Sequence, residues 1–258
     1  MKRFCLTLFL ALVIAVAAPA GQDLIIGVTP FPHKDIMEVV KTLVAKDGYN
    51  LIIREFTDYV VPNTALAEGH LFANFFQHIP YLDNMNQARG LNLAWIAKIH
   101  IEPLGFYSKK IKSLDELRED SSISLPNDPT NCARALRLLE ANGLIKLKPG
   151  ELVTSRDIVE NPRKLRFREI NAAQLPRTLD DVTASVINTN FAGEAGLIPS
   201  RDAIIIEDKD SPYANVVVIR AVDKDSPAAQ ILAKASNSPE VMEYIEKELI
   251  PKGIMPAF

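Results

Sequence analysis

Residues 23–46, DLIIGVTPFPHKDIMEVVKTLVAK, decide the fold class. Residues 24–28 are a short continuous apolar run, which is typical of a strand buried on both faces. From residue 34 to residue 46, apolar side chains recur at the spacing of one helical face. They are Ile36, Val39, Val40, Leu43 and Val44. A buried strand followed by an amphipathic helix is the unit from which sheets flanked by helices are built, so we expect an α/β protein.

The same alternation continues along the chain. Predicted strands are residues 51–56, 71–76, 122–125, 164–170, 184–187, 203–206 and 215–222, and predicted helices are 61–68, 129–142, 228–235 and 239–249. Residues 94–108 form one long β-like stretch that Pro103 interrupts. Because proline is poorly tolerated inside a sheet, this stretch predicts a strand that leaves one sheet and enters another.

We therefore expect two lobes, each a mostly parallel sheet flanked by helices, joined by crossing segments. The candidate crossings lie at Glu102-Pro103 and within residues 188–215. The expected division is a signal peptide at 1–20, a first lobe of 21–105 and 196–258, and a second lobe of 106–195. Such a clamshell binds its ligand in the cleft, at the carboxyl ends of strands from both lobes.

The first twenty residues have the pattern of a secretory signal peptide. Lys2 and Arg3 supply positive charge, residues 4–18 are apolar and uncharged, and residues 18–20 have the small-x-small pattern of a cleavage site. The alternative is a membrane anchor, but a run of about 15 residues falls short of the roughly 20 that span a bilayer. We expect export and cleavage before Gly21.

Composition limits the classes of partner. The formal net charge is −3, and loss of the signal peptide with Lys2 and Arg3 makes it more negative. This mild acidity argues against nucleic acid or an anionic membrane as the main partner. Cys5 would leave with the signal peptide, so Cys132 has no partner for an internal disulfide and the apolar core must stabilise the fold.

Neither a metal site nor a cofactor site is indicated. His33, His70, His78 and His100 are scattered without paired spacing, and no pair of cysteines accompanies them. No glycine-rich phosphate loop and no serine nucleophile motif occurs. Cys132 with a distant histidine is a conceivable nucleophilic pair, but a buried structural thiol is the more common role. We expect no cofactor, no metal and no catalysis.

Residues 74–82, NFFQHIPYL, concentrate aromatic side chains in a chain that has few of them. Rings give large contact area at low rotamer cost, and tyrosine and histidine keep a polar tip that can orient a ligand. Phe76, His78 and Tyr81 therefore suit the wall of a small pocket. From the sequence alone, a place in the ordinary core explains the phenylalanines equally well.

Two further groups of polar residues suit an amino acid head group. Asp128 is a natural N-cap with proline directly after it, and Arg134 lies in the second turn of the helix that follows, where it could bind a carboxylate or simply face solvent. Asn188, Asn190 and Asn215 lie at strand ends. An amide can accept from an ammonium and donate to a carboxylate, although asparagines also stabilise turns.

Six segments of the chain together resemble one family, the MetQ/NlpA methionine-binding proteins of ABC importers. They are residues 55–60 (EFTDYV), 74–82 (NFFQHIPYL), 101–105 (IEPLG), 124–129 (SLPNDP) with 134–136 (RAL), 186–192 (VINTNFA) and 207–215 (EDKDSPYAN). The resemblance covers essentially all of residues 21–258. It implies a type II periplasmic binding protein clamshell that binds L-methionine and delivers it, as a monomer, to a membrane permease with its ATPase.

The resemblance also implies roles for individual residues. Arg134 binds the ligand carboxylate, Asn190 and Asn215 bind the head group, and Asn188 is a neighbour of the site. Four residues line the pocket for the ligand side chain: Tyr59, Phe76, His78 and Tyr81.

One departure from the family concerns the anchor. Members usually carry a cysteine directly after the cleavage site, where lipid is attached, whereas residues 17–22 are AAPAGQ. We therefore expect a protein that is free in the periplasm.

The ligand also has alternatives, because relatives differ in what they carry: either methionine enantiomer, a methionine dipeptide or another amino acid. A Cys132-dependent enzyme, or an exported antigen or adhesin that only keeps the fold, would be further alternatives.

Overall fold

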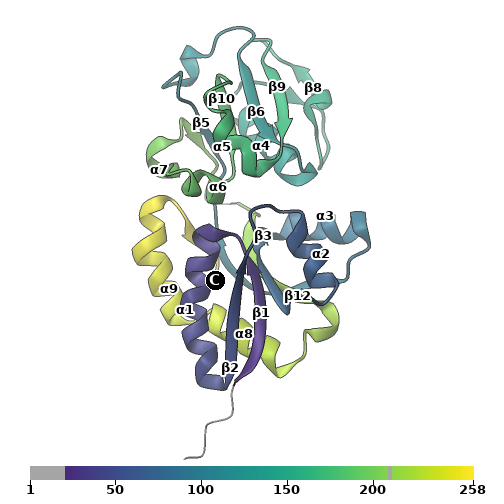
Figure 1. Cartoon of the computed structure of the whole chain (residues 1–258). Helices are drawn as coiled ribbons and strands as arrows, with labels where there is room; N and C mark the ends of the chain where they lie inside the picture. Colours follow the sequence, from purple (N-terminus) through teal and green to yellow (C-terminus); the bar gives the residue numbers. More distant parts are fainter. Residues whose placement is uncertain (1–20, 209–210) are drawn as a thin grey trace, which may run out of the picture.

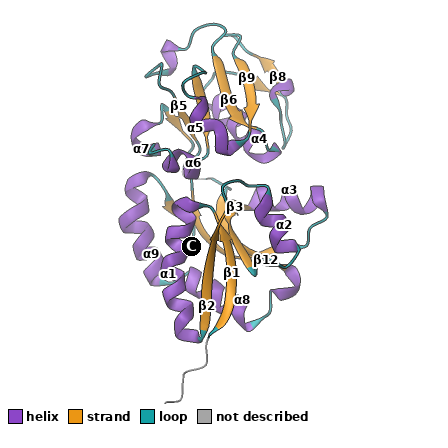
Figure 2. Ribbon diagram, viewed as in Figure 1, coloured by secondary structure: helices purple, strands orange, loops and turns teal. Residues whose placement is uncertain are grey.

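The computed structural model describes residues 21–208 and 211–258 (Figure 1). The predicted signal peptide at 1–20 lies outside the described residues. Within them the chain forms two lobes, each a sheet with flanking helices, as Figure 2 shows. This confirms the two-lobed α/β fold. No helix in the described ranges has the length and apolar character needed to cross a membrane.

The first lobe holds a six-stranded sheet of order β13-β4-β12-β3-β1-β2. Its strands are β1 (Gln22–Val28), β2 (Tyr49–Glu55), β3 (Ala73–His78), β4 (Leu93–Ile101), β12 (Ala214–Arg220) and β13 (Met255–Pro256). Its helices are α1 (Asp35–Val44), α2 (Val61–Ala67), α3 (Ile79–Arg89), α8 (Pro227–Ser236) and α9 (Pro239–Tyr244). Helices α1, α8 and α9 cover one face, and α2 and α3 cover the other (Figure 1). Strand β12, buried over residues 214–219, alternates between these two cores: Val217 and Ile219 face the first, and Val216 and Val218 the second.

The second lobe holds a five-stranded sheet of order β11-β5-β10-β6-β9. Its strands are β5 (Gly105–Tyr107), β6 (Ser122–Pro126), β9 (Arg166–Ile170), β10 (Ala184–Ile187) and β11 (Ile205–Ile206). Its helices are α4 (Pro129–Ala141), α5 (Leu175–Thr178), α6 (Thr189–Glu194) and α7 (Pro199–Asp202), and β7 (Lys146–Leu147) pairs with β8 (Ile158–Glu160) beside the sheet. Helix α4 packs its apolar side, including Ala135, Leu136 and Leu139, into the core.

Both sheets are mixed, not mostly parallel as expected. In the first, β1 runs parallel to β2 and β3, but β12 lies antiparallel between β3 and β4. In the second, β6 runs parallel to β9 and β10, but β5 is antiparallel to β10 and β11. The reason is the crossing between lobes. Strands β5 and β12 each enter a lobe from a crossing, so they start at the edge where β10 and β3 end. They are therefore antiparallel to those strands.

Two segments cross between the lobes. Strand β4 belongs to the six-stranded sheet and β5 to the five-stranded sheet, which confirms the predicted change of sheet at Pro103. The chain returns between β11 and β12, and the Glu207 N–H donates to the Leu104 carbonyl at 2.9 Å, so the two crossings lie side by side. Residues 205–206 pair with β5, although they lie within the range 196–258 assigned to the first lobe. We propose that the second lobe extends to about this return crossing.

Candidate functional site

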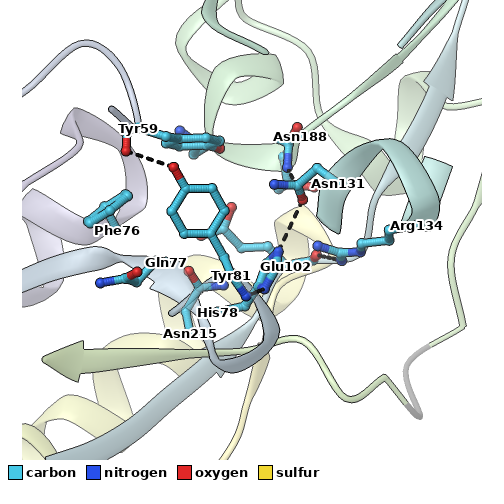
Figure 3. Close-up of a pocket in the computed structure, with 12 residues that line it drawn as sticks. Tyr59, Phe76, Gln77, His78, Tyr81, Glu102, Asn131, Arg134, Asn188 and Asn215 are labelled. Carbon is cyan, nitrogen blue, oxygen red and sulfur yellow. Dashed lines mark hydrogen bonds between the residues drawn. The ribbon is translucent and has the colours of Figure 1, made fainter. Parts of the chain in front are cut away.

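A cavity lies between the lobes, at the level of the two crossings (Figure 3). Its lining includes all eight predicted site residues: Tyr59, Phe76, His78, Tyr81, Arg134, Asn188, Asn190 and Asn215. Four others that the sequence analysis did not propose complete it: Gln77, Glu102, Asn131 and Thr189. The cavity meets the carboxyl ends of β3, β4, β6 and β10, and only Asn215 comes from the amino end of its strand.

Aromatic rings form one wall of the cavity. The ring of Tyr59 lies 5.8 Å from that of Phe76 and 6.0 Å from that of Tyr81, centroid to centroid, and Phe76 and Tyr81 are 5.9 Å apart. Phe191 of α6 closes the group from the second lobe, 4.9 Å from Tyr59. Separations in this range are typical of edge-to-face and tilted aromatic pairs, so the wall is apolar and well packed.

The junction of β3 and α3 positions three side chains that line the cavity, those of Phe76, His78 and Tyr81. Because side chains alternate along a strand, Phe75 points into the core of the first lobe and Phe76 into the cavity. Phe75 is therefore a core residue and Phe76 a pocket residue, so each of the two interpretations holds for one phenylalanine. His78 is the N-cap of α3, where its Nδ1 accepts from the Tyr81 N–H at 3.1 Å. The cap fixes His78 and turns Tyr81 toward the same cavity.

Asn131 links the two lobes on the polar side of the cavity. Its Oδ1 accepts from Asn188 Nδ2 at 2.9 Å and from His78 Nε2 at 3.1 Å, and its Nδ2 donates to the Asp128 carboxylate. Burial lowers the pKa of His78 to about 3, and the nearby Arg134 charge adds to this. His78 is therefore neutral, with its single proton on Nε2.

Two buried polar atoms in the cavity wall have no partner among the described residues. They are Asn188 Oδ1, an acceptor, and Asn190 Nδ2, a donor. Both side chains are held by their other amide atom, since Asn188 Nδ2 donates to Asn131 and Asn190 Oδ1 accepts from the Tyr59 hydroxyl at 2.5 Å. Buried polar groups are rarely left unpaired, so these atoms indicate a ligand that carries both a donor and an acceptor.

Arg134 supplies positive charge but is already engaged on two sides. Its Nε donates to Glu207 Oε1 at 2.9 Å, and its Nη2 donates to Glu207 Oε2 and to the Glu102 carbonyl, the latter at 2.7 Å. The Tyr213 ring covers one face, with its centroid 4.2 Å from the guanidinium carbon. Within the described residues, Nη1 alone of the three guanidinium nitrogens donates no hydrogen bond. No local sequence pattern indicated Glu207 as the partner of Arg134.

Glu102, His33 and His100 form a buried group beside the cavity that could in principle hold a metal ion. His100 Nε2 donates to Glu102 Oε1 at 2.7 Å, and His33 Nε2 lies 3.3 Å from the same oxygen while it donates to Asn215 Oδ1 at 3.1 Å. Ligand atoms around a tetrahedral zinc lie roughly 3.3 Å apart. The 2.7 Å contact is a hydrogen-bond distance, so a hydrogen-bonded network describes this group better than a metal site.

The charges of this network follow from its burial. Burial lowers the pKa of His33 to about 4, against an opposing effect of Glu102, and lowers that of His100 to about 3. Burial also raises the pKa of Glu102, while His33 and Arg134 lower it. The hydrogen bond from His100 to Glu102 and the close approach of His33 to the same carboxylate therefore involve neutral rings and are not ion pairs.

These pKa shifts predict that the free energy of unfolding falls as the pH drops from about 6.5 toward 4. The unfolded chain protonates His33, His78 and His100 near pH 6.5, whereas the folded protein resists protonation until about pH 4 or 3. Each imidazole then lowers the free energy of unfolding by up to about 1.4 kcal/mol for each unit by which the pH falls. The raised pKa of Glu102 partly offsets this loss. Urea unfolding at pH 7 and pH 5 measures the effect.

The control for this prediction is the exposed His70, and the test variant is His78→Gln. His78→Gln should flatten the pH dependence of stability, whereas His70→Ala should leave it as it is. Equal stability of the unaltered protein at pH 7 and pH 5 would contradict the assignment of neutral buried histidines.

The similarity to known proteins extends over nearly the whole described chain. A family model described as NlpA lipoprotein matches residues 24–258. Outer membrane lipoprotein 3 of Mannheimia haemolytica is 48% identical over 239 residues, which are 91% of this chain and 90% of the relative. The D-methionine-binding lipoprotein MetQ of Salmonella typhi is 46% identical over 242 residues, 89% of each chain.

Solved structures agree with the observed fold. A nutrient binding protein from Burkholderia cenocepacia bound to methionine superposes with a TM-score of 0.88 at 46% identity, covering 91% of this chain and 100% of that chain. The methionine binding protein MetQ superposes with a TM-score of 0.88 at 42% identity, covering 92% and 98%. All residues that line the cavity lie within residues 24–258, which the family model matches.

Proposed function

Because this chain belongs to the NlpA lipoprotein family, we propose that it is the substrate-binding component of an ABC amino-acid importer and that L-methionine is its ligand. The lobes close around the amino acid, and the closed form docks on a membrane permease that works with an ATPase. Closure is favoured because the bound head group contacts both lobes at once.

The observation that best supports this proposal is the unpaired pair of amide atoms, Asn188 Oδ1 and Asn190 Nδ2. An α-amino acid carries an ammonium donor and a carboxylate acceptor a few ångströms apart, which complements this pair. The free Nη1 of Arg134 adds a second donor for the carboxylate, and Glu102 adds negative charge for the ammonium. Asn215 completes the head-group site beside Glu102.

The ring wall supports a thioether side chain. Tyr59, Phe76 and Tyr81 offer aromatic edges, and sulfur gains contact energy at ring edges because it is polarizable. His78 caps the wall with a neutral imidazole. This side of the cavity therefore favours an apolar, unbranched side chain over a charged one.

A binding role fits Cys132 better than a catalytic one. The thiol is 3% exposed, packs in the core of the second lobe and is absent from the lining of the cavity. Burial raises its pKa to about 12, so the thiolate that a nucleophile requires does not form near neutral pH. We therefore propose that the protein binds and releases its ligand unchanged.

The proposal places the protein in the periplasm as a monomer, exported by the signal peptide at residues 1–20. The relatives named above include lipoproteins. The chain has no cysteine at the expected cleavage site, which supports a protein that is not anchored by lipid there. Radiolabelled palmitate incorporation in the native host distinguishes an anchored form from a free one.

A thermal-shift panel tests the ligand. Protein refolded from denaturant, and so stripped of ligand, is heated with L-methionine, D-methionine, a methionine dipeptide, L-leucine and L-glutamine. We expect the largest shift from L-methionine, since ligand at about a thousand times its dissociation constant adds about 4 kcal/mol to the unfolding free energy. An equal shift from leucine and methionine would contradict the thioether assignment, and no shift from any amino acid would favour a role outside transport.

A further inference from the structure

We propose that Glu207 is a positioning residue for ligand recognition: it is a fixed counter-ion that keeps the Arg134 guanidinium from pairing with the Glu102 carboxylate and directs Nη1 into the cavity. This inference rests on the proposed binding of an amino acid zwitterion. It assigns a role to a residue that does not line the cavity and that comes from the return crossing.

The contact between the Arg134 and Glu207 side chains is bidentate and largely buried. Arg134 Nε lies 2.9 Å from Glu207 Oε1 and 3.1 Å from Oε2, and Nη2 also donates to Oε2. The Arg134 side chain is 3% exposed and that of Glu207 17% exposed. A paired contact of this kind fixes the plane of a guanidinium as well as its position.

Glu207 is itself held by the backbone of the other crossing. Its N–H donates to the Leu104 carbonyl at 2.9 Å, and the Leu104 N–H donates back to Glu207 Oε2 at 3.3 Å. The carboxylate therefore cannot leave Arg134 without breaking a contact between the two crossings. A ligand carboxylate would join Glu207 on the guanidinium and would not displace it.

The remaining sides of the guanidinium are also occupied. Nη2 donates to the Glu102 carbonyl at 2.7 Å, and the Tyr213 ring lies against one face. With Nε and Nη2 committed, Nη1 is the donor left for a ligand. Arg134 lines the cavity, so the ligand carboxylate meets this nitrogen there.

The arrangement of charge explains why a counter-ion is needed. The Glu102 carboxylate also lines the cavity, and Arg134 is the nearby cation that acts on its pKa. Without Glu207, Arg134 and Glu102 would attract each other, and each would neutralise the group that the ligand needs. With Glu207 in place, Arg134 is balanced on its outer side, and Glu102 stays available for the ammonium.

The test compares two ligands, L-methionine and L-methioninamide, which differ only in the carboxylate. Their dissociation constants are measured by titration calorimetry at pH 6.5 for the full protein and for Glu207→Gln. We expect Glu207→Gln to lower the preference for methionine over methioninamide at least tenfold. Loss of stability alone would weaken both ligands equally. The exposed Glu160, which pairs with Lys146, provides the matched control Glu160→Gln, which should leave the preference unchanged.

Two outcomes would overturn the inference. An unchanged preference would make Glu207 a purely structural partner, and an increased preference for methionine would make it a competitor of the ligand carboxylate. If Glu207→Gln does not fold, Glu207→Asp keeps the charge at a shorter reach and should lower the preference about threefold or more. If the unaltered protein binds neither ligand, the proposed function fails and this inference fails with it, whereas methionine binding with an unchanged preference in Glu207→Gln overturns this inference alone.

Discussion

Replacing Arg134 with alanine is expected to weaken methionine binding by a factor of about 10² to 10³. Arg134 is the one cation among the described residues that line the cavity, so the ligand carboxylate would lose this partner. Removing one partner of a buried charge pair typically costs 2–5 kcal/mol, and every 1.4 kcal/mol corresponds to tenfold in affinity. Titration calorimetry on ligand-stripped protein measures the change.

The control for this prediction lies on the same helix. Arg137 is exposed and hydrogen-bonds to the Gly150 carbonyl, away from the cavity. Arg137→Ala should leave the affinity within about twofold, as surface substitutions generally do. Affinity that survives Arg134→Ala would place the ligand carboxylate elsewhere.

Arg134→Ala should also destabilise the folded protein, because it leaves the carboxylate of Glu207 without its cation. Breaking a buried pair from one side costs about 3–5 kcal/mol. The double variant Arg134→Ala/Glu207→Gln removes the unpaired charge, so it should regain part of the stability without regaining affinity. Thermal melts of the single and double variants therefore separate the effect on folding from the effect on binding.

Much of the fold followed from the sequence because the signals were local. The apolar run in β1 and the helical spacing in α1 each depend on a few neighbouring residues, and Pro103 marked the crossing by its chemistry alone. The direction of β12 was not predicted, since it depends on where the chain re-enters the first lobe. Helix α3 was missed too. Its polar sequence lacks an apolar stripe, and its N-cap is a histidine, which is not a usual capping residue.

The site was predictable in part for the same reason. The eight expected residues line one cavity. Residue chemistry pointed to seven of them with other roles left open, whereas Tyr59 and the individual roles came from the family segments. Glu102 lay inside one of those segments and Asn131 between two of them, but nothing local distinguishes a lining asparagine or glutamate from a capping or surface one. The Arg134–Glu207 contact joins residues 73 positions apart, and only the side-by-side packing of the two crossings creates it.

Tyr59 holds the ring wall together, so its removal is the second large effect that we expect. Its ring contacts Phe76 and Tyr81 from the first lobe and Phe191 from the second, and its hydroxyl donates to Asn190 Oδ1. Tyr59→Ala removes both the ring and the hydroxyl. We expect a loss of methionine affinity of about 30-fold to 100-fold, on the order of 2–3 kcal/mol, as for truncation of a central aromatic contact.

Tyr59→Phe separates the two contributions. It keeps the ring wall and removes only the hydroxyl, which leaves Asn190 Oδ1 buried without a donor, at a cost of about 1–3 kcal/mol. If the ring selects the ligand side chain, Tyr59→Phe should weaken methionine and leucine equally, whereas Tyr59→Ala should reduce the preference for methionine. Calorimetry with both amino acids measures this. An unchanged preference in Tyr59→Ala would show that the aromatic wall does not distinguish a thioether from a branched side chain.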